Sequence, residues 1–474
     1  MQDEKASWGE LLRGRNGLRS IALAGGVALH AVNVYIATTI LPSVVRDIGG
    51  LEYYAWNTTL FVAASIFGSA LSPRTLDRLG PRYAFLAAIF LFSLGTGLCA
   101  AAPDMAWMLI GRTVQGFGGG LLLGLSYSSI RIVFEERLWA LAMGLTSSMW
   151  GVATLAGPAI GGMFAESGHW RWAFWAVLPV SALLAWMVCT QIAVKAREGR
   201  GGLRAPLPQI ALMVVSVMVV SVASLSHSVV WNGVGLVLGI AISVLIARLD
   251  GRMSVRLMPT GGYVLDGGLG NLYACICLLS IGITVEVFAP YFLQVVHGYA
   301  PLAAGYLTAL MSAGWTLGSV PSSSRGPAAA HRLMRIGPVI SAVSMAVLAV
   351  LFSIPGLNEK GQAVWWMMLP LLGVGLGIGV CWPHLLTQVF RVSPAGEENR
   401  ASSAIITLQL YAMALGATLG GMVVNAAGFT DPGGVEGTQS AAVALFAVFA
   451  CAPALAAALM VAVVRRKAMA AAAS

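Results

Sequence analysis

The chain consists mainly of long apolar runs separated by short polar stretches. A membrane-spanning helix needs roughly 20 predominantly apolar residues. Fourteen runs of about that length occur, at 18–42, 55–73, 82–101, 105–131, 138–163, 171–192, 207–226, 229–247, 268–295, 301–321, 333–354, 363–390, 401–426 and 440–464. The weakest separation is the short polar patch at 226–228, between the seventh and eighth runs. The pattern predicts an all-α membrane protein with fourteen transmembrane helices.

Composition agrees with this pattern. Of 474 residues, 58% are hydrophobic and 10% are charged, and the mean hydropathy is +0.81. A soluble domain carries about 25% charged residues, so this chain has too few to cover a surface that faces water. The first 17 residues are polar and lack the apolar core of a signal peptide, so the first run is predicted to remain as an uncleaved helix. The six cysteines lie in apolar runs without metal-ligand spacing, and we expect no metal site.

Positive charge sets the expected orientation. Cytoplasmic loops carry an excess of Lys and Arg. With the N-terminus inside and fourteen alternating spans, all but four of the 28 Lys and Arg residues fall on the inner side. Arg46, Arg171 and Lys360 fall outside, and Arg112 lies within the fourth span. We therefore expect both termini in the cytoplasm. The net charge of +9 reflects this asymmetry, and no nucleic-acid partner is expected.

Two internal repeats indicate paired halves. Gly161-Gly162-Met163 is echoed by Gly420-Gly421-Met422, and Gly68-Ser69 by Gly318-Ser319. Paired halves with a binding site at their interface are a recurring transporter architecture. The expected segments are an inner tail (1–17), a six-helix bundle (18–192), an inner loop (193–206), two extra helices (207–247), an inner loop (248–267), a second six-helix bundle (268–464) and an inner tail (465–474).

Four motifs occur in order along the first half. The loop after the second span reads LDRLGPR at 76–82, the fourth span contains RTVQGFG at 112–118, and the sixth opens with WRWAFW at 170–175. The fifth span combines Gly144 with a GPAIGG stretch, in which the named positions are Gly157, Pro158, Gly161 and Gly162. Together these motifs resemble the major facilitator superfamily, in particular its fourteen-helix drug:proton antiporter branch.

The resemblance implies roles for two of these motifs. Asp77, Arg78 and Arg82 would form a cytoplasmic gating contact, with Arg131 as a partner and with Asp77 near the N-terminus of the thirteenth span. The alternative is that this loop only orients the chain. The glycine-rich fifth span would pack tightly at the interface where the two halves rock. A plain helix-packing face is the alternative, and the two interpretations are compatible.

The chain departs from the branch at three positions. Pro73 and Pro81 stand where glycine and arginine are common. Asn33 stands where the first span of the branch usually has an acid. Because a carboxylate that would help to handle protons or cations is missing at Asn33, the coupling scheme and any preference for multiply charged cations are in question.

Ionisable residues inside a span are costly and usually functional. Glu286 in the ninth span is the only one of the 19 acids expected near the middle of the membrane. We predict that it carries protons, with a structural carboxyl as the alternative. Arg112 is predicted to contact the proton path or the substrate, or else to form a structural hub with Gln115. His30 lies in the first span, and a relay from His30 to Glu286 is conceivable, although a lone histidine is more often simply hydrogen-bonded.

Aromatic and amide residues on the expected cavity helices suit a bulky, partly apolar ligand. The candidates are Asn33, Tyr35, Gln115, Tyr127, Trp150, Trp315, Trp382 and Gln409.

The sequence therefore predicts a multi-pass protein of a bacterial cytoplasmic (inner) membrane that exports amphipathic small molecules, drugs or a secreted metabolite, in exchange for protons. A proton-coupled symporter for one metabolite is the alternative. No enzyme is expected, because zincin, paired-aspartate and nucleophile-elbow motifs are missing, and the lack of a Walker motif argues against direct use of ATP. We expect no cofactor beyond the proton-motive force. The expected partners are the substrate, protons and the lipid bilayer, with the protein as a monomer.

Overall fold

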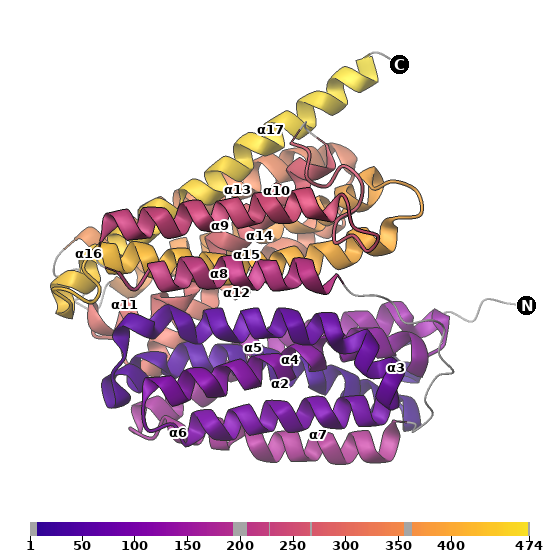
Figure 1. The fold of residues 1–474 in the computed structure, drawn as a ribbon, viewed down its shortest axis with the longest axis horizontal. Coiled ribbons are helices and arrows are strands. Elements are labelled where there is room, and N and C mark those ends of the chain that lie inside the picture. Colours follow the sequence, from indigo (N-terminus) through magenta and orange to yellow (C-terminus); the bar gives the residue numbers. More distant parts are fainter. Residues whose placement is uncertain (1–6, 193–205, 227, 266–267, 355–362, 473–474) are drawn as a thin grey trace, which may run out of the picture. The chain divides into compact units, whose positions relative to one another are not determined.

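The structure is a computed structural model that describes residues 7–192, 206–226, 228–265, 268–354 and 363–472. Within these residues every regular element is helical (Figure 1). Nine helical segments of the described chain are long and apolar enough to cross a membrane. The prediction of an all-α membrane protein is confirmed. Helices cover all fourteen predicted runs, but not all of them meet that criterion, so the number of spans stays a prediction.

The described chain divides into two compact units. The first unit lies within Met1–Gly50 and Leu60–Ile210, and the second lies within Leu51–Thr59 and Ala211–Ser474. The helices of the N-terminal part are α1 (Trp8–Leu12), α2 (Gly14–Ile48), η1 (Leu51–Tyr53), α3 (Tyr54–Ala100), α4 (Met105–Val133), η2 (Glu136–Leu138), α5 (Trp139–Glu166), α6 (Arg171–Trp175) and α7 (Val177–Gln191). In this unit α2 lies beside both α4 and α5 (Figure 1).

Helix α3 contains two predicted spans. The sequence predicts a polar loop between them, whereas the helix continues to Leu79 and breaks at Gly80, where φ is 73° and ψ is 165°. Glycine adopts a positive φ without steric cost. Pro81 then begins the second half of the helix. Proline is suited to this position, because the backbone N–H groups of a first helical turn have no partner within the helix and the N–H that proline lacks is not needed. The connection is a sharp turn, and Asp77 and Arg78 lie in the last helical turn before it.

Glycines bring α3 and α4 into close contact. A Cβ on Gly116 would lie 2.2 Å from the Phe61 carbonyl oxygen, and one on Gly95 would lie 2.2 Å from the Gln115 nitrogen. Real Cβ atoms do not approach backbone atoms so closely. Small residues let membrane helices approach each other in this way. The α4 motif therefore fixes α4 against both halves of α3.

The later helices are α8 (Leu207–Ala223), α9 (Val229–Asp250), α10 (Leu269–Ile283), η3 (Thr284–Val287), α11 (Ala289–Val295), α12 (Pro301–Ser323), α13 (Pro327–Ser353), α14 (Ala363–Val392), α15 (Glu398–Ala426), α16 (Gly434–Phe449) and α17 (Cys451–Ala472). The predicted ninth span is therefore not one continuous α-helix. It consists of α10, a 3-10 turn and α11.

The first internal repeat corresponds to a repeated packing arrangement. In the first unit, a Cβ on Gly157 of α5 would lie 2.3 Å from Tyr35 Cβ of α2. In the second unit, a Cβ on Gly416 of α15 would lie 2.6 Å from Thr284 Oγ1. Gly157 and Gly416 are 259 residues apart, as are the two Gly-Gly-Met sequences. The fifth predicted span contacts the first as the thirteenth contacts the ninth.

The second repeat behaves in the same way. A Cβ on Gly68 would lie 2.2 Å from the Phe117 carbonyl oxygen of α4, and one on Gly318 would lie 2.6 Å from the Leu376 carbonyl oxygen of α14. Both glycines allow one helix of their unit to contact the backbone of another. The two sequence repeats thus mark equivalent helix contacts.

The two extra helices are hydrogen-bonded to α15. The Tyr411 hydroxyl of α15 lies 2.6 Å from Ser216 Oγ of α8 and 2.8 Å from Ser243 Oγ of α9. Thr418 Oγ1, two turns further along α15, lies 2.8 Å from Ser221 Oγ of α8. Hydroxyl groups inside a membrane protein need partners. This network therefore attaches α8 and α9 to the second unit.

Candidate functional site

A polar network lies inside the first unit, between α2, α3 and α4. Arg112 Nη1 donates a 2.6 Å hydrogen bond to Gln115 Oε1, and Gln115 Nε2 donates to Asn33 Oδ1 at 2.9 Å and to Thr96 Oγ1 at 2.8 Å. Thr96 donates its own proton to the Phe92 carbonyl at 2.7 Å, so it only accepts from Gln115. The bonds therefore run in one direction and fix how the Gln115 amide is turned.

Arg112 is fully enclosed in this unit. Its side chain is buried, with 2% of the residue exposed, and its guanidinium carbon lies 4.1 Å from the centre of the Phe61 ring. A cation over an aromatic face is attracted by the ring quadrupole. The predicted contact with Gln115 is confirmed, and it fits the structural alternative. A direct role in the proton path stays a prediction.

His30 lies between two aromatic rings of the same unit. Its ring centre is 5.2 Å from that of Phe61 and 6.0 Å from that of Trp150. His30 is buried, and its Nδ1 has no hydrogen-bond partner among the described residues. Gly119 leaves space for it, since a Cβ there would lie 2.7 Å from Nδ1. The lone histidine thus keeps one ring nitrogen for a ligand, water or proton.

Asn33 occupies the position at which the resemblance leads one to expect an acid. Its Oδ1 accepts the bond from Gln115, but its Nδ2 is buried without a partner in the described chain. An unsatisfied buried donor costs roughly 1–3 kcal/mol. An aspartate here would carry no such donor. The amide therefore offers an N–H group next to the Arg112 network.

Glu286 lies in the 3-10 turn η3, between α10 and α11. Pro290 follows four residues later, and proline has no N–H to donate to the Glu286 carbonyl. Its ring also clashes with a carbonyl in that position, which accounts for the break in the helix. The Glu286 side chain is half-buried between the buried Val285 and Val287. Among the described residues it has no ion-pair or hydrogen-bond partner.

His30 and Glu286 belong to different units. The relay between them stays a prediction.

The predicted cavity residues fall into separate groups. Asn33 and Gln115 belong to the network of the first unit, and Trp150 faces the His30 ring. Also in the first unit, the Tyr35 Cβ faces Gly157, and the Tyr127 hydroxyl lies 3.3 Å from Ser147 Oγ. In the second unit, the ring centres of Trp315 and Trp382 are 4.9 Å apart. Gln409 is half-buried in α15.

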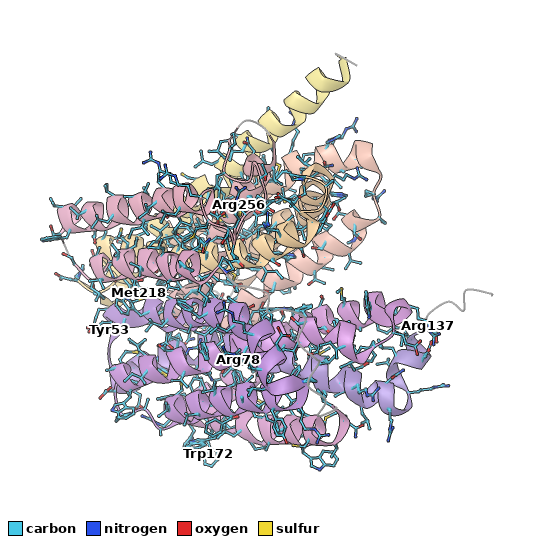
Figure 2. All side chains as sticks on the ribbon, turned by 45° about the vertical axis from the view of Figure 1, so that its right-hand side comes forward. Tyr53, Arg78, Arg137, Trp172, Met218 and Arg256 are labelled. Atoms are coloured by element: carbon cyan, nitrogen blue, oxygen red, sulfur yellow. The ribbon has the colours of Figure 1, made fainter. Side chains whose placement is uncertain are left out.

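The gating residues are only partly in contact. Asp77 and Arg78 are exposed, and Arg78 can be followed in Figure 2. Arg82 Nε donates a 2.8 Å hydrogen bond to the Ile192 carbonyl just after α7. The side chain of Arg131 lies outside the described residues. A contact between Asp77 and Arg131 therefore stays a prediction.

The remaining positions of the α5 motif differ in their surroundings. Pro158 and Gly162 are buried, whereas a Cβ on Gly144 would meet its nearest neighbour, the Trp8 ring of α1, at 4.0 Å. Gly157 and Gly161 face α2, and a Cβ on Gly161 would lie 3.1 Å from the Ile36 carbonyl oxygen. The helix-packing interpretation of the motif is confirmed for these two glycines. Rocking between the two halves stays a prediction.

Sequence reasoning missed four residues that shape these sites. Phe61, Thr96 and Gly119 contact Arg112, Gln115 and His30 from other helices, and no local pattern marks them. Pro290 could have been found, because its spacing of four from Glu286 by itself predicts an interrupted helix.

Comparison with known proteins agrees with this architecture. A family model described as the Major Facilitator Superfamily matches residues 23–417. A protein of Mycobacterium tuberculosis (strain H37Rv) named as a "Probable multidrug-efflux transporter" is 37% identical over 439 residues, which cover 90% of this chain and 91% of the relative. "Multidrug resistance protein 3" of Bacillus subtilis is 23% identical over 411 residues, covering 85% of this chain and 78% of the relative.

Solved structures show the same fold. A D-xylose-proton symporter superimposes with a TM-score of 0.65 at 15% identity, covering 94% of this chain and 97% of that one. A peptide transporter of the POT family gives 0.66 at 16% identity, covering 95% and 98%. The apolar helices and the match over most of its length identify the chain as a multi-pass membrane protein that belongs to the Major Facilitator Superfamily of transporters.

Proposed function

We propose that this protein is a proton-driven antiporter that exports amphipathic small molecules across a bacterial cytoplasmic membrane by alternating access. Fourteen spans with both termini in the cytoplasm complete the proposal. The names of the relatives from Mycobacterium tuberculosis and Bacillus subtilis support export. The spacing and order of the four sequence motifs support the antiporter branch.

The observation that carries the proposal is the placement of Glu286. Its carboxyl group lies at a break between two membrane helices, in the 3-10 turn that joins α10 to α11. Mid-helix 3-10 turns often mark functional hinges, and interrupted helices form the ion sites of many transporters. With no ion-pair partner among the described residues, the Glu286 carboxyl is suited to gain and lose a proton during each cycle.

The substrate side of the proposal rests on the first unit and on the tryptophan pair. Phe61 and Trp150 provide flat apolar surfaces beside the His30 ring, and Asn33 Nδ2 and His30 Nδ1 provide polar atoms without partners in the described chain. Trp315 and Trp382 provide a second aromatic surface. Aromatic side chains with a few polar groups among them are typical of sites that bind bulky, partly apolar ligands. The absence of an acid at Asn33 favours neutral, zwitterionic or singly charged substrates over dications.

In this mechanism substrate binding and protonation of Glu286 alternate. The protonated carboxyl is neutral, so it does not carry the free-energy cost of a charge in the membrane interior. A change in the conformation of the η3 turn would then accompany the change in access. Symport of one metabolite is the second candidate, and the structural likeness to a D-xylose-proton symporter is compatible with it.

The test uses inside-out vesicles with an acidic lumen, monitored by quenching of an acridine dye. Ethidium, a zwitterionic fluoroquinolone and an anionic bile salt are added in turn outside. We expect at least one compound to discharge the pH gradient with the wild-type protein and not with Glu286→Gln. Glu436→Gln is the matched control, because Glu436 is an exposed acid in the first turn of α16.

The outcomes separate the candidates. Equal discharge by wild type and Glu286→Gln would remove Glu286 from the coupling scheme. If the gradient responds only in right-side-out vesicles, with alkalinisation outside on addition of substrate, the protein is a symporter. Glu286→Asp should retain part of the response, since it keeps a carboxyl group at a shorter reach.

A further inference from the structure

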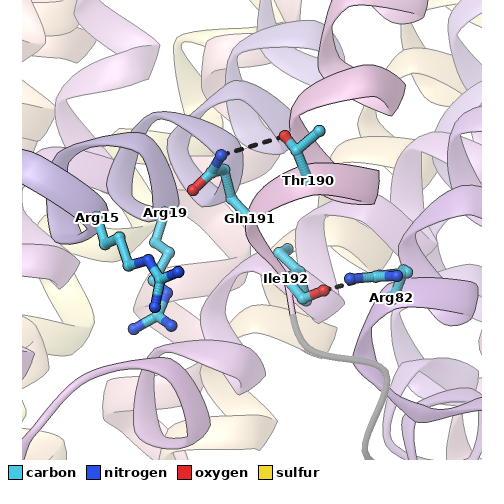
Figure 3. Close-up of a pocket in the computed structure, with 6 residues that line it drawn as sticks. All are labelled: Arg15, Arg19, Arg82, Thr190, Gln191 and Ile192. Atoms are coloured by element: carbon cyan, nitrogen blue, oxygen red, sulfur yellow. Dashed lines mark hydrogen bonds between the residues drawn. The ribbon is translucent and has the colours of Figure 1, made fainter.

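A basic pocket of about 260 Å³ lies at one end of the first unit (Figure 3). Arg15 and Arg19 of α2 and Arg82 of α3 contribute its charged side chains, and the end of α7 contributes Thr190, Gln191 and Ile192. This is the end that the charge pattern predicts to face the cytoplasm. None of the residues of the pocket belongs to the network around Arg112.

Helix geometry brings these groups together. Arg15 and Arg19 are four residues apart, so they share one face of α2. Figure 3 shows their side chains extending into the same region. Helices α2 and α7 are closely packed, because a Cβ on Gly25 would lie 2.8 Å from Leu184 Cδ1. Arg82 is held by its 2.8 Å bond to the Ile192 carbonyl. That bond uses Nε and leaves the terminal nitrogens of Arg82 for a ligand.

The charge of this pocket is not balanced by the described chain. Other arginines have acidic partners: Arg171 pairs with Asp47, and Arg400 with Glu397. For the three arginines of the pocket, no carboxylate partner is found among the described residues. Like charges held around one cavity repel each other, and an anion would stabilise them. Guanidinium groups bind phosphate oxygens in paired hydrogen bonds, so the pocket fits a phosphate group.

The surroundings of the pocket favour a lipid as the source of that phosphate. Leu18, next to Arg19, is 43% exposed, and Tyr83, next to Arg82, is 53% exposed. Trp186 lies one turn before Thr190 on α7 and is 63% exposed. Tyr and Trp are typical of the boundary between membrane and water. Basic pockets between membrane helices at the cytoplasmic face bind anionic headgroups.

We propose that the pocket formed by Arg15, Arg19 and Arg82 binds the phosphate headgroup of an anionic membrane lipid. The acyl chains lie along the exposed apolar side chains of α2 and α7. The inference rests on the proposed cytoplasmic orientation of this end, but not on proton coupling or on the substrate. A soluble phosphate compound offers the same chemistry without the acyl chains, and the test separates the two.

The test is native mass spectrometry of the purified full-length protein titrated with cardiolipin and, separately, with phosphatidylcholine. We expect wild type to retain cardiolipin with a salt-sensitive affinity and to release phosphatidylcholine. The double variant Arg15→Gln/Arg19→Gln should bind cardiolipin at least tenfold more weakly. Arg46→Gln is the matched control, because Arg46 is an exposed arginine at the other end of α2, and its affinity should stay within twofold of wild type.

Three further measurements make the result decisive. Arg15→Lys/Arg19→Lys keeps the charge and should recover most of the affinity, and unchanged thermal unfolding midpoints show that the variants are folded. Calorimetric titration with inorganic phosphate and glycerol phosphate tests the soluble source. Equal cardiolipin binding by wild type and the glutamine variant overturns the proposal, as does a wild type that binds no cardiolipin. If the glutamine variant loses binding of the phosphate compounds but binds cardiolipin as wild type does, the pocket is assigned to a soluble ligand. No transport is measured, so this result is independent of the proposed antiport.

Discussion

The His30 ring of α2 packs directly against Gly119 of α4, and it occupies the space that a methyl group on Gly119 would need. A Cβ on Gly119 would lie 2.7 Å from His30 Nδ1, which is closer than real Cβ contacts allow. His30 is also confined by the Phe61 and Trp150 rings, at 5.2 and 6.0 Å. The glycine therefore determines where the imidazole lies, so a small residue of α4 positions a side chain of α2.

Gly119→Ala is expected to displace His30 and to lower stability. Overpacking a well-filled site costs about 1–3 kcal/mol, so the thermal unfolding midpoint in detergent should fall by several degrees. Gly97→Ala is the matched control, because a Cβ on Gly97 of α3 would meet nothing within 4 Å. The double variant Gly119→Ala/His30→Ala should regain stability. If the single variant is as stable as the control, His30 does not depend on Gly119.

The contact at Gly157 in the first unit and the equivalent contact at Gly416 in the second unit should respond alike when the glycine is replaced by alanine. Gly157→Ala brings a methyl against Tyr35 Cβ, and Gly416→Ala brings one against Thr284 Oγ1, at 2.3 and 2.6 Å before relaxation. Each should lower the unfolding midpoint by an amount that corresponds to about 2 kcal/mol. Gly151→Ala, which meets nothing within 4 Å, should be neutral. A large effect in one copy and none in the other would contradict the equivalence of the two contacts.

The sequence predicted the helices and the repeat because both depend on local composition. Apolar runs of fixed length mark helices wherever the solvent is lipid, and Gly157 and Gly161 repeat a spacing that Gly416 and Gly420 share. It also paired Arg112 with Gln115, since residues three apart on a helix are neighbours.

Contacts between helices were not accessible in the same way. Nothing near Arg112 in the sequence indicates that Phe61 lies beneath it or that Thr96 accepts from Gln115. The basic pocket was missed for the same reason. Arg15 and Arg19 were counted as signals of orientation and Arg82 was assigned to the gating contact, and only the fold shows that the three share one cavity.

The contact between Glu397 and Thr260 should depend on pH. Glu397 accepts a hydrogen bond from the Thr260 N–H at 2.7 Å and one from Arg400 at 2.7 Å. The Thr260 N–H, with Arg400 beside it, holds the pKa of this carboxyl below its usual value of 4.5. Because the folded-state pKa is depressed, the contact stabilises the protein above the usual pKa and is lost as the pH falls through the depressed value.

Hydrogen exchange at Thr260 measures this effect. After correction for intrinsic rates, protection of the Thr260 amide should be constant from pH 7 to 5 and fall towards pH 3. The pair lies near the surface, so we expect a change below about 1 kcal/mol. Glu397→Gln should show weaker protection without this pH dependence. Unchanged protection at pH 3 in wild type would mean that other contacts hold the loop, such as the Asp250 carboxylate that accepts from the Leu257 and Met258 amides.

Pro290→Ala should join α10 and α11 and reduce transport. Alanine restores a donor for the Glu286 carbonyl and removes the ring that clashes with it, so η3 can become α-helical. We expect the unfolding midpoint to rise, hydrogen exchange at 287–291 to slow, and proton-coupled transport to fall several-fold, because the Glu286 carboxyl turns with its backbone. Pro301→Ala is the control, since Pro301 begins α12, where the missing N–H has no partner to lose. A variant that gains protection yet transports at the wild-type rate would show that the break is dispensable. A variant that loses transport without gaining protection would place the effect of Pro290 in packing and not in the backbone.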